Sequence, residues 1–317
     1  MSKNVTPDAS ETIIGELASS TRPTTRAARW ADRFEPYIWL IPALAIFSLF
    51  ELLPLGVGLA LSLLAWDGSA PARFVGLANY LQAMGDTAYW GALGHNLVYA
   101  IGTVCGKLVL GLGLAIVLNQ AMPGRAIFRT ALFLPVVLSF VVVGLLWSWI
   151  YNYDSGLLNT VLRHIGLGVW ARDWLGDPRV ALAAVIAVDV WKWFGFHMVI
   201  FLAGLQSIPD DLYEAAVLDG ATRWQSHRWI TIPLLVPVTA INLVLAASGA
   251  FNVFDVVYVM TQGGPVNATN VAMIEIYREA FQFYRFGYAA ALSVMQLIIV
   301  SVISLVILRM THRERYL

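Results

Sequence analysis

The sequence predicts an all-α membrane protein with about six transmembrane helices. Of its 317 residues, 59% are hydrophobic and 13% are charged, and the mean hydropathy is +0.70. Soluble domains carry about 25% charged residues, so the charged fraction of this chain is about half of the usual value. The apolar residues also come in blocks of the length that one membrane-spanning helix needs. The single cysteine excludes an internal disulfide, and no Cys/His spacing in the sequence is typical of a metal site.

Six apolar blocks are long enough to span a bilayer. The first contains Pro54, which lacks a backbone N–H, so a kink or break is expected there. It also contains Glu51, whose carboxylate should face protein or water because a charge is costly in lipid. Residues 1–34 are polar and lack the apolar core of a signal peptide, so they are predicted to form a disordered cytoplasmic tail before a transmembrane domain at 35–317. The blocks are residues 37–64, 96–119, 129–151, 181–205, 232–260 and 287–309.

The distribution of positive charge predicts the orientation. Twelve of the 20 Lys and Arg residues lie in the two termini, in the connection between the second and third blocks, and in the connection between the fourth and fifth. Cytoplasmic segments carry the excess of Lys and Arg, so both termini are predicted to be cytoplasmic. The connection between the fourth and fifth blocks is then cytoplasmic as well.

That connection, residues 207–231 and hereafter the polar loop, has unusually clear helix boundaries. Capping boxes are predicted at 207–210 and at 222–225, each opening a short helix. Gly220 can adopt the left-handed conformation that ends the first helix, and the second is expected to end near Ile230. We therefore expect two short helices joined by a tight turn. Such a segment is either a docking site for a partner or an ordinary amphipathic segment at the membrane surface.

Within the polar loop, the stretch EAAVLDGA (214–221) is followed by WITIPLLVP (229–237). This combination resembles the EAA–G signature of the permease subunits of binding-protein-dependent ABC importers. The resemblance extends over roughly residues 36–310 and points to the carbohydrate-uptake branch of that family. The stretches that carry this branch likeness are FRTALFLPVV (128–137), WKWFGFHMVIFLAGLQSIP (191–209), FDVVYVMTQGGP (254–265) and YREAFQFYRFGYAAALSV (277–294).

The resemblance implies a type I ABC importer permease-like fold in the bacterial inner membrane. It implies that the polar loop is a coupling helix seated in a groove of a cytoplasmic ATPase. It further implies a complex with a second homologous permease subunit, two ATPase subunits and an extracytoplasmic sugar-binding protein. The residues that match the coupling signature are Glu214, Ala215, Ala216, Asp219, Gly220, Ile232 and Pro233.

This chain is not expected to hydrolyse ATP itself. A phosphate-binding loop needs Gly, four residues and then Gly-Lys-Ser/Thr. The nearest stretch, GTVCGKL (102–108), is one residue short and has Leu108 in place of Ser or Thr. No cofactor is therefore expected in this chain, and ATP and Mg²⁺ are expected on the partner ATPase. The sequence also lacks a nucleophile–base set, so no enzyme activity is expected.

Polar and aromatic residues in the fourth and fifth blocks are candidates for the substrate path. Aromatic rings pack on the C–H faces of a sugar, and amide or carboxylate groups bind its hydroxyls. The alternatives are that Lys192 forms a buried Lys–Asp pair or snorkels, and that the tryptophans belong to the interfacial belt. The candidates are Trp191, Lys192, Trp193, Asn252, Phe254 and Asp255.

The competing function is a stand-alone secondary transporter driven by an ion gradient. In that hypothesis Lys192, Asp255 and Glu51 would be proton or ion sites. The sequence assigns no role to Lys107, which lies inside the second block.

Overall fold

The computed structural model describes residues 37–313, apart from residues 38, 70 and 121. The predicted tail at 1–34 lies outside these residues. Contacts within the chain divide it into two units, Met1–Gly58 and Leu59–Leu317.

The helix that begins at Trp39 continues without a break to Ser62 and contains Pro54 in its last part, α3 (Leu53–Ser62), so the expected break does not occur. The turn before the proline widens to the π-helix η1 (Ser48–Leu52), in which the Leu53 N–H donates to the Ser48 carbonyl. Glu51 lies in this turn with an exposed side chain.

Among the residues that the structure describes, four helices are individually long and apolar enough to cross a membrane, and two bent pairs of helices pass the same test together. Counting each bent pair as one span gives six, in agreement with the sequence. The four are Trp39–Ser62, α5 (Thr87–Asn119), α9 (Ala181–Gln206) and α16 (Phe286–Arg313), the last over Phe286–Ile307. The pairs are α6 (Arg125–Val137) with α7 (Phe140–Ile150), bent by 99°, and the helical segment Arg223–Leu234 with α13 (Val236–Phe251), bent by 64°.

The prediction of a single span at 232–260 is wrong at its C-terminal end, because α13 stops at Phe251. The carbonyl of Ala250 accepts a hydrogen bond from the Asn96 amide at 3.1 Å, and that of Phe251 accepts one from Gln296 at 3.0 Å. Inside a membrane a helix can end only where protein groups satisfy the freed carbonyls. The amides of α5 and α16 do this, and the chain then passes into the separate helix α14 (Asp255–Met260).

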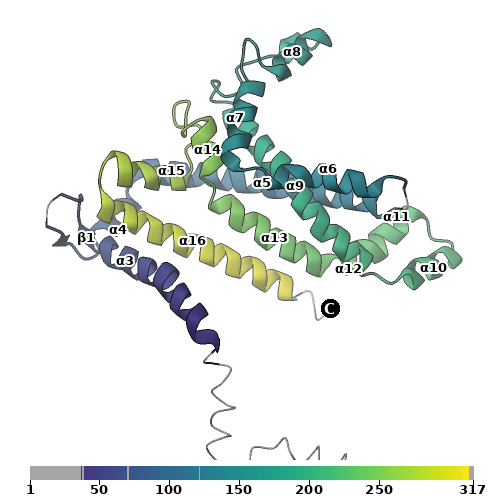
Figure 1. Ribbon diagram of the computed structural model, residues 1–317, viewed down its shortest axis with the longest axis horizontal. Helices are drawn as coiled ribbons and strands as arrows, with labels where there is room; N and C mark the ends of the chain where they lie inside the picture. Colours follow the sequence, from purple (N-terminus) through teal and green to yellow (C-terminus); the bar gives the residue numbers. More distant parts are fainter. Residues whose placement is uncertain (1–36, 38, 70, 121, 314–317) are drawn as a thin grey trace, which may run out of the picture. The chain divides into compact units, whose positions relative to one another are not determined.

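The helices of the second unit form a bundle around α5 and α9, which pack side by side (Figure 1). Gly106 allows their close approach, because a Cβ there would lie 2.7 Å from the Val190 side chain. The largest buried cluster includes Tyr99 on α5 and Val185 and Val188 on α9.

Shorter elements lie at the two ends of this bundle. The helix α10 (Asp210–Leu218), with α11 (Arg223–Ser226), η3 (His227–Thr231) and α12 (Ile232–Leu234), lies at one end. At the other end lie the antiparallel strands β1 (Leu64–Ala65) and β2 (Arg73–Phe74), α4 (Ala78–Met84), α15 (Ala272–Tyr277) and η4 (Arg278–Gln282) (Figure 1). After α7 come α8 (Leu157–His164) and η2 (Gly168–Trp170).

Candidate functional site

The polar loop contains the two short helices that the sequence predicts, but the first begins differently. The predicted capping box at 207–210 is wrong: Pro209 is the N-cap of α10, and no side chain caps it. The Ser207 hydroxyl instead donates to the Gly204 carbonyl at 2.8 Å, at the end of α9. The second capping box is confirmed, since the Gln225 N–H donates to the Thr222 hydroxyl and the Thr222 N–H donates to the Gln225 side chain.

The turn between these helices depends on Gly220, which has φ of +78°. The Ala221 N–H donates to the Ala216 carbonyl at 2.9 Å, and the Gly220 N–H donates to the Val217 carbonyl at 3.0 Å. These two bonds form the Schellman motif that ends a helix at a left-handed glycine. A Cβ at Gly220 would meet nothing within 4 Å, so the requirement for glycine comes from the backbone and not from crowding.

The second short helix does not end near Ile230, as the sequence predicted. It continues through the π-helical turn η3 into α12, and the bend comes at Leu235. Thr231 is buried in this turn and shares a hydrogen bond of 2.9 Å with the Tyr213 hydroxyl on α10. The second helix of the loop therefore runs without a break up to the bend that precedes α13, and a side-chain hydrogen bond ties α10 to it.

The residues that match the coupling signature lie on the outside of this loop. Glu214, Ala215, Asp219 and Gly220 are exposed, and Ala216 is half-buried. Ile232 and Pro233, at the start of the following helix, are exposed as well. Large apolar side chains are exposed beside them, with exposed fractions of 69% for Val217, 88% for Leu218, 72% for Trp224 and 71% for Trp229. The part of the loop formed by α10, the turn at Gly220 and α11 is called the knob below. Its exposed apolar side chains and carboxylates suit it to docking on another protein surface.

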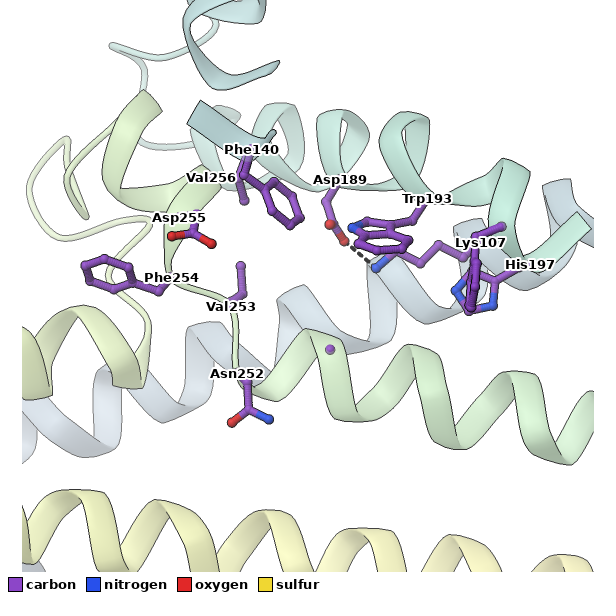
Figure 2. A pocket seen from close by; sticks show the side chains of 12 residues that line it. Lys107, Phe140, Asp189, Trp193, His197, Asn252, Val253, Phe254, Asp255 and Val256 are labelled. Carbon is purple, nitrogen blue, oxygen red and sulfur yellow. Dashed lines mark ion pairs between the residues drawn. The ribbon is translucent and has the colours of Figure 1, made fainter. Parts of the chain in front are cut away.

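A cavity of about 140 Å³ lies within the bundle, where α13 ends and α14 begins (Figure 2). Four of the six candidate path residues line it: Trp193, Asn252, Phe254 and Asp255. The side chains of Asn252 and Phe254 point away from the charged pair at the other side of the cavity (Figure 2). The remaining lining residues are Lys107, Phe140, Asp189, Phe196, His197, Gly249, Val253 and Val256.

Two candidates, Trp191 and Lys192, do not line this cavity. Trp191 packs against Trp147, with ring centroids 5.4 Å apart, at the edge of the main core. The Lys192 ammonium donates to three carbonyls at the end of α6, those of Pro135 (3.3 Å), Val136 (3.0 Å) and Leu138 (2.6 Å). It satisfies the backbone at the 99° bend, which divides the predicted span at 129–151 into α6 and α7. Lys192 thus has a structural task that neither the substrate interpretation nor the Lys–Asp alternative anticipated.

A buried Lys–Asp pair does exist, but it joins Lys107 on α5 to Asp189 on α9. The two charged groups are 2.5 Å apart, and their side chains are only 4% and 5% exposed. Figure 2 shows this pair at the wall of the cavity, beside Trp193. Asp189 is not among the site residues that the sequence predicts. The available signal was its spacing, because Asp189, Trp193 and residues 196–197 follow one another on a single helical face.

A second polar contact joins α9 to α13. His197 Nδ1 lies 2.8 Å from the Asn242 side-chain oxygen, and both residues are buried. Together with the ion pair, this contact fixes the positions of α5, α9 and α13 around the cavity. The lining of the cavity therefore combines aromatic rings and an exposed carboxylate at Asp255 with the exposed Asn252, whose amide nitrogen donates to the Ser248 carbonyl at 3.0 Å. This combination suits a neutral ligand rich in hydroxyls.

Residues 107–313 match the family model described as "Binding-protein-dependent transport system inner membrane component". The trehalose/maltose transport system permease protein MalF of Thermococcus litoralis is 35% identical, over 88% of this chain and 94% of that protein. The xylose/arabinose import permease protein XacH of Haloferax volcanii is 37% identical, over 84% of each chain.

A solved structure gives the same fold. One chain of a bacterial alginate ABC transporter, in complex with an alginate pentasaccharide-bound periplasmic protein, superposes with a TM-score of 0.79. The superposition covers 91% of this chain and 98% of that chain, at 26% sequence identity. Residues 107–313, which match the family model, contain the polar loop, the Lys107–Asp189 ion pair and all the residues that line the cavity.

Proposed function

Because the chain belongs to the family of inner-membrane components of binding-protein-dependent transport systems, we propose that it forms a carbohydrate path driven through the polar loop. Membership makes the chain a multi-pass permease subunit of an ABC importer, and it excludes the stand-alone secondary transporter. The proposal concerns the cargo, the residues that contact it and the residues that couple transport to ATP.

The cargo is a carbohydrate, and the cavity residues Trp193, Asn252, Phe254 and Asp255 form part of its path. Two relatives are named for the transport of sugars, and the similar solved structure belongs to an alginate importer. The cavity supports this cargo because it combines rings with an amide and a carboxylate. Rings cover the C–H faces of a pyranose, and the polar groups accept and donate hydrogen bonds to its hydroxyls.

The polar loop is the coupling element, and its exposed knob is the single observation that carries the proposed function. Glu214, Ala215, Ala216, Asp219 and Gly220 contact a separate ATPase subunit, which holds ATP and Mg²⁺. Pro233 stands where the loop joins the next span, so movement of the knob is passed directly to α13. Small alanines allow close approach, and the exposed apolar side chains are covered on docking.

In the complete importer this chain pairs with a second homologous permease, two ATPase subunits and an extracytoplasmic sugar-binding protein. Both termini lie in the cytoplasm, so the knob faces the ATPase. Closure of the ATPase dimer on ATP moves the two knobs and opens the bundle to the outside. The binding protein then releases sugar into the cavity, and hydrolysis of ATP resets the complex.

The test is uptake by the complete importer in proteoliposomes, with trehalose, maltose, xylose, arabinose and alginate pentasaccharide as probes. We expect uptake of at least one probe, dependent on ATP and on the binding protein, and insensitive to collapse of the proton gradient. Glu214→Lys should abolish this uptake and the ATPase stimulation while membrane insertion is unchanged, because Glu214 is exposed. Normal uptake in Glu214→Lys, or no uptake of any probe by the unaltered importer, would contradict the proposal.

A further inference from the structure

A second pocket, of about 460 Å³, lies between α14, the following loop and α15–η4. These elements lie at the end of the bundle opposite to the knob of the polar loop (Figure 1). The pocket is therefore separate from the coupling surface. Its lining residues are Ala88, Tyr258, Gln262, Asn267, Ile274, Glu275, Tyr277, Arg278, Gln282 and Phe283.

Two half-buried tyrosines, Tyr258 and Tyr277, form the aromatic part of this pocket. Their ring centroids are 5.2 Å apart, and their hydroxyls lie 3.4 Å from each other. Phe254 stacks on Tyr258 at 5.1 Å, and Phe281 packs against Tyr277 at 5.2 Å. Neighbouring rings on both sides hold the pair in place, so its orientation is set before any ligand arrives.

The polar part of the pocket is held equally firmly. The Arg278 guanidinium donates to the Asn267 side chain at 2.9 Å and to the Gln262 carbonyl at 2.7 Å, which ties the loop to the start of η4. The buried Glu275 carboxylate accepts a hydrogen bond of 2.6 Å from the Asn270 amide. A carboxylate can accept several hydrogen bonds, and a guanidinium has five donors, so both groups keep capacity for a ligand.

Phe254 connects this outer pocket to the cavity inside the bundle. It lines the inner cavity, and it stacks on Tyr258, which lines the outer pocket. Phe254, Tyr258 and Tyr277 all contact one another, so one cluster of three rings reaches from the outer pocket to the inner cavity. A pocket that received only a peptide segment of the binding protein would not need ring contacts that reach the inner cavity. These contacts therefore favour the transported molecule as the occupant of the outer pocket.

We propose that the outer pocket is an entry site for the carbohydrate, where Tyr258 and Tyr277 contact its C–H faces and Glu275 and Arg278 contact its hydroxyls. This inference rests on the proposed function. The molecule released by the binding protein is held here first and then passes along Phe254 into the cavity. The affinity of this site for the carbohydrate must be low, because the transported molecule also has to leave it.

The test uses the complete importer in proteoliposomes, with the five probes named above. Tyr277→Ala should raise the KM for the transported probe by up to about tenfold, the effect of losing one ring contact, with little change in kcat. Tyr277→Phe keeps the ring and should retain most of the affinity. Tyr153→Ala is the matched control, because Tyr153 is an exposed tyrosine outside both pockets and should change neither parameter.

A second variant avoids the ring cluster. Gln282 is exposed and lines the pocket, so Gln282→Cys in a Cys105→Ser background can be modified with a bulky maleimide without disturbing the fold. We expect the modification to raise KM several-fold while the binding protein still docks and stimulates the ATPase. An unchanged KM in Tyr277→Ala and in modified Gln282→Cys would overturn the entry site while leaving the proposed function intact. Loss of binding-protein docking on modification would overturn it too, by showing a protein-docking surface. Absence of uptake in the unaltered importer would instead refute the proposed function itself.

Discussion

The buried pair Lys107–Asp189 allows the most quantitative prediction. Its charged groups are 2.5 Å apart, which at an effective dielectric constant near 20 gives a gross attraction of about 7 kcal/mol. Desolvation of two buried ions costs several kcal/mol each and offsets most of this attraction. The net contribution of the pair is therefore small, whereas loss of one partner leaves an uncompensated buried charge.

Asp189→Leu and Lys107→Met should each destabilise the permease by about 3–5 kcal/mol. The double variant Lys107→Met/Asp189→Leu should lie much closer to the unaltered protein, so the two substitutions should be strongly non-additive. The assay is thermal unfolding of the purified importer in detergent, followed by tryptophan fluorescence. Asp154→Asn, at an exposed aspartate, serves as the control for removal of a carboxylate.

Single variants within about 0.5 kcal/mol of the unaltered protein would refute this reasoning, because surface substitutions have effects of that size. Additive losses in the double variant would refute it as well. Either result would mean that water reaches the pair and screens it.

Three further predictions follow from the backbone geometry. Gly220→Asn should retain uptake, and Gly220→Val should lose ATPase stimulation. The left-handed conformation at this position costs a residue with a Cβ about 1–2 kcal/mol, and asparagine tolerates it best. Equal activity of the two variants would contradict the role of the positive φ. Lys192→Met should lower the thermal stability by ~3 kcal/mol or more, because three carbonyls lose their donor; a changed sugar KM at unchanged stability would instead place Lys192 on the substrate path. Gly106→Leu should prevent close packing of α5 on α9 and reduce the yield of folded protein, with partial rescue by Val190→Ala; a normal yield of Gly106→Leu would contradict the contact.

The sequence predicted those features whose causes are local. The turn of the polar loop follows from Gly220 and from the box at 222–225, which need only residues within one turn of each other. The start of α10 was misread because Ser207 had a second acceptor available, the Gly204 carbonyl at the end of the preceding helix. The number of spans followed from apolar length alone.

The features that the sequence did not predict depend on contacts between distant parts of the chain. The bend after α6 is stable because Lys192, far along the sequence, donates to its last carbonyls. The end of α13 at Phe251 likewise depends on Asn96 and Gln296 from two other helices. The sequence assigns no role to Lys107, because its partner Asp189 lies on another helix. Periodicity within one helix contains no information about such partners.

The most direct test of the central claim is a cross-link between the polar loop and the ATPase. Ala215→Cys, in a Cys105→Ser background, places a reactive thiol on the exposed surface of the knob. Val266→Cys, which is 90% exposed in the connection between α14 and α15, is the matched control. We predict that a short bifunctional thiol reagent joins Ala215→Cys, and not Val266→Cys, to the ATPase subunit of the assembled importer. Absence of an ATPase adduct at Ala215→Cys in an importer that still transports would contradict the claim.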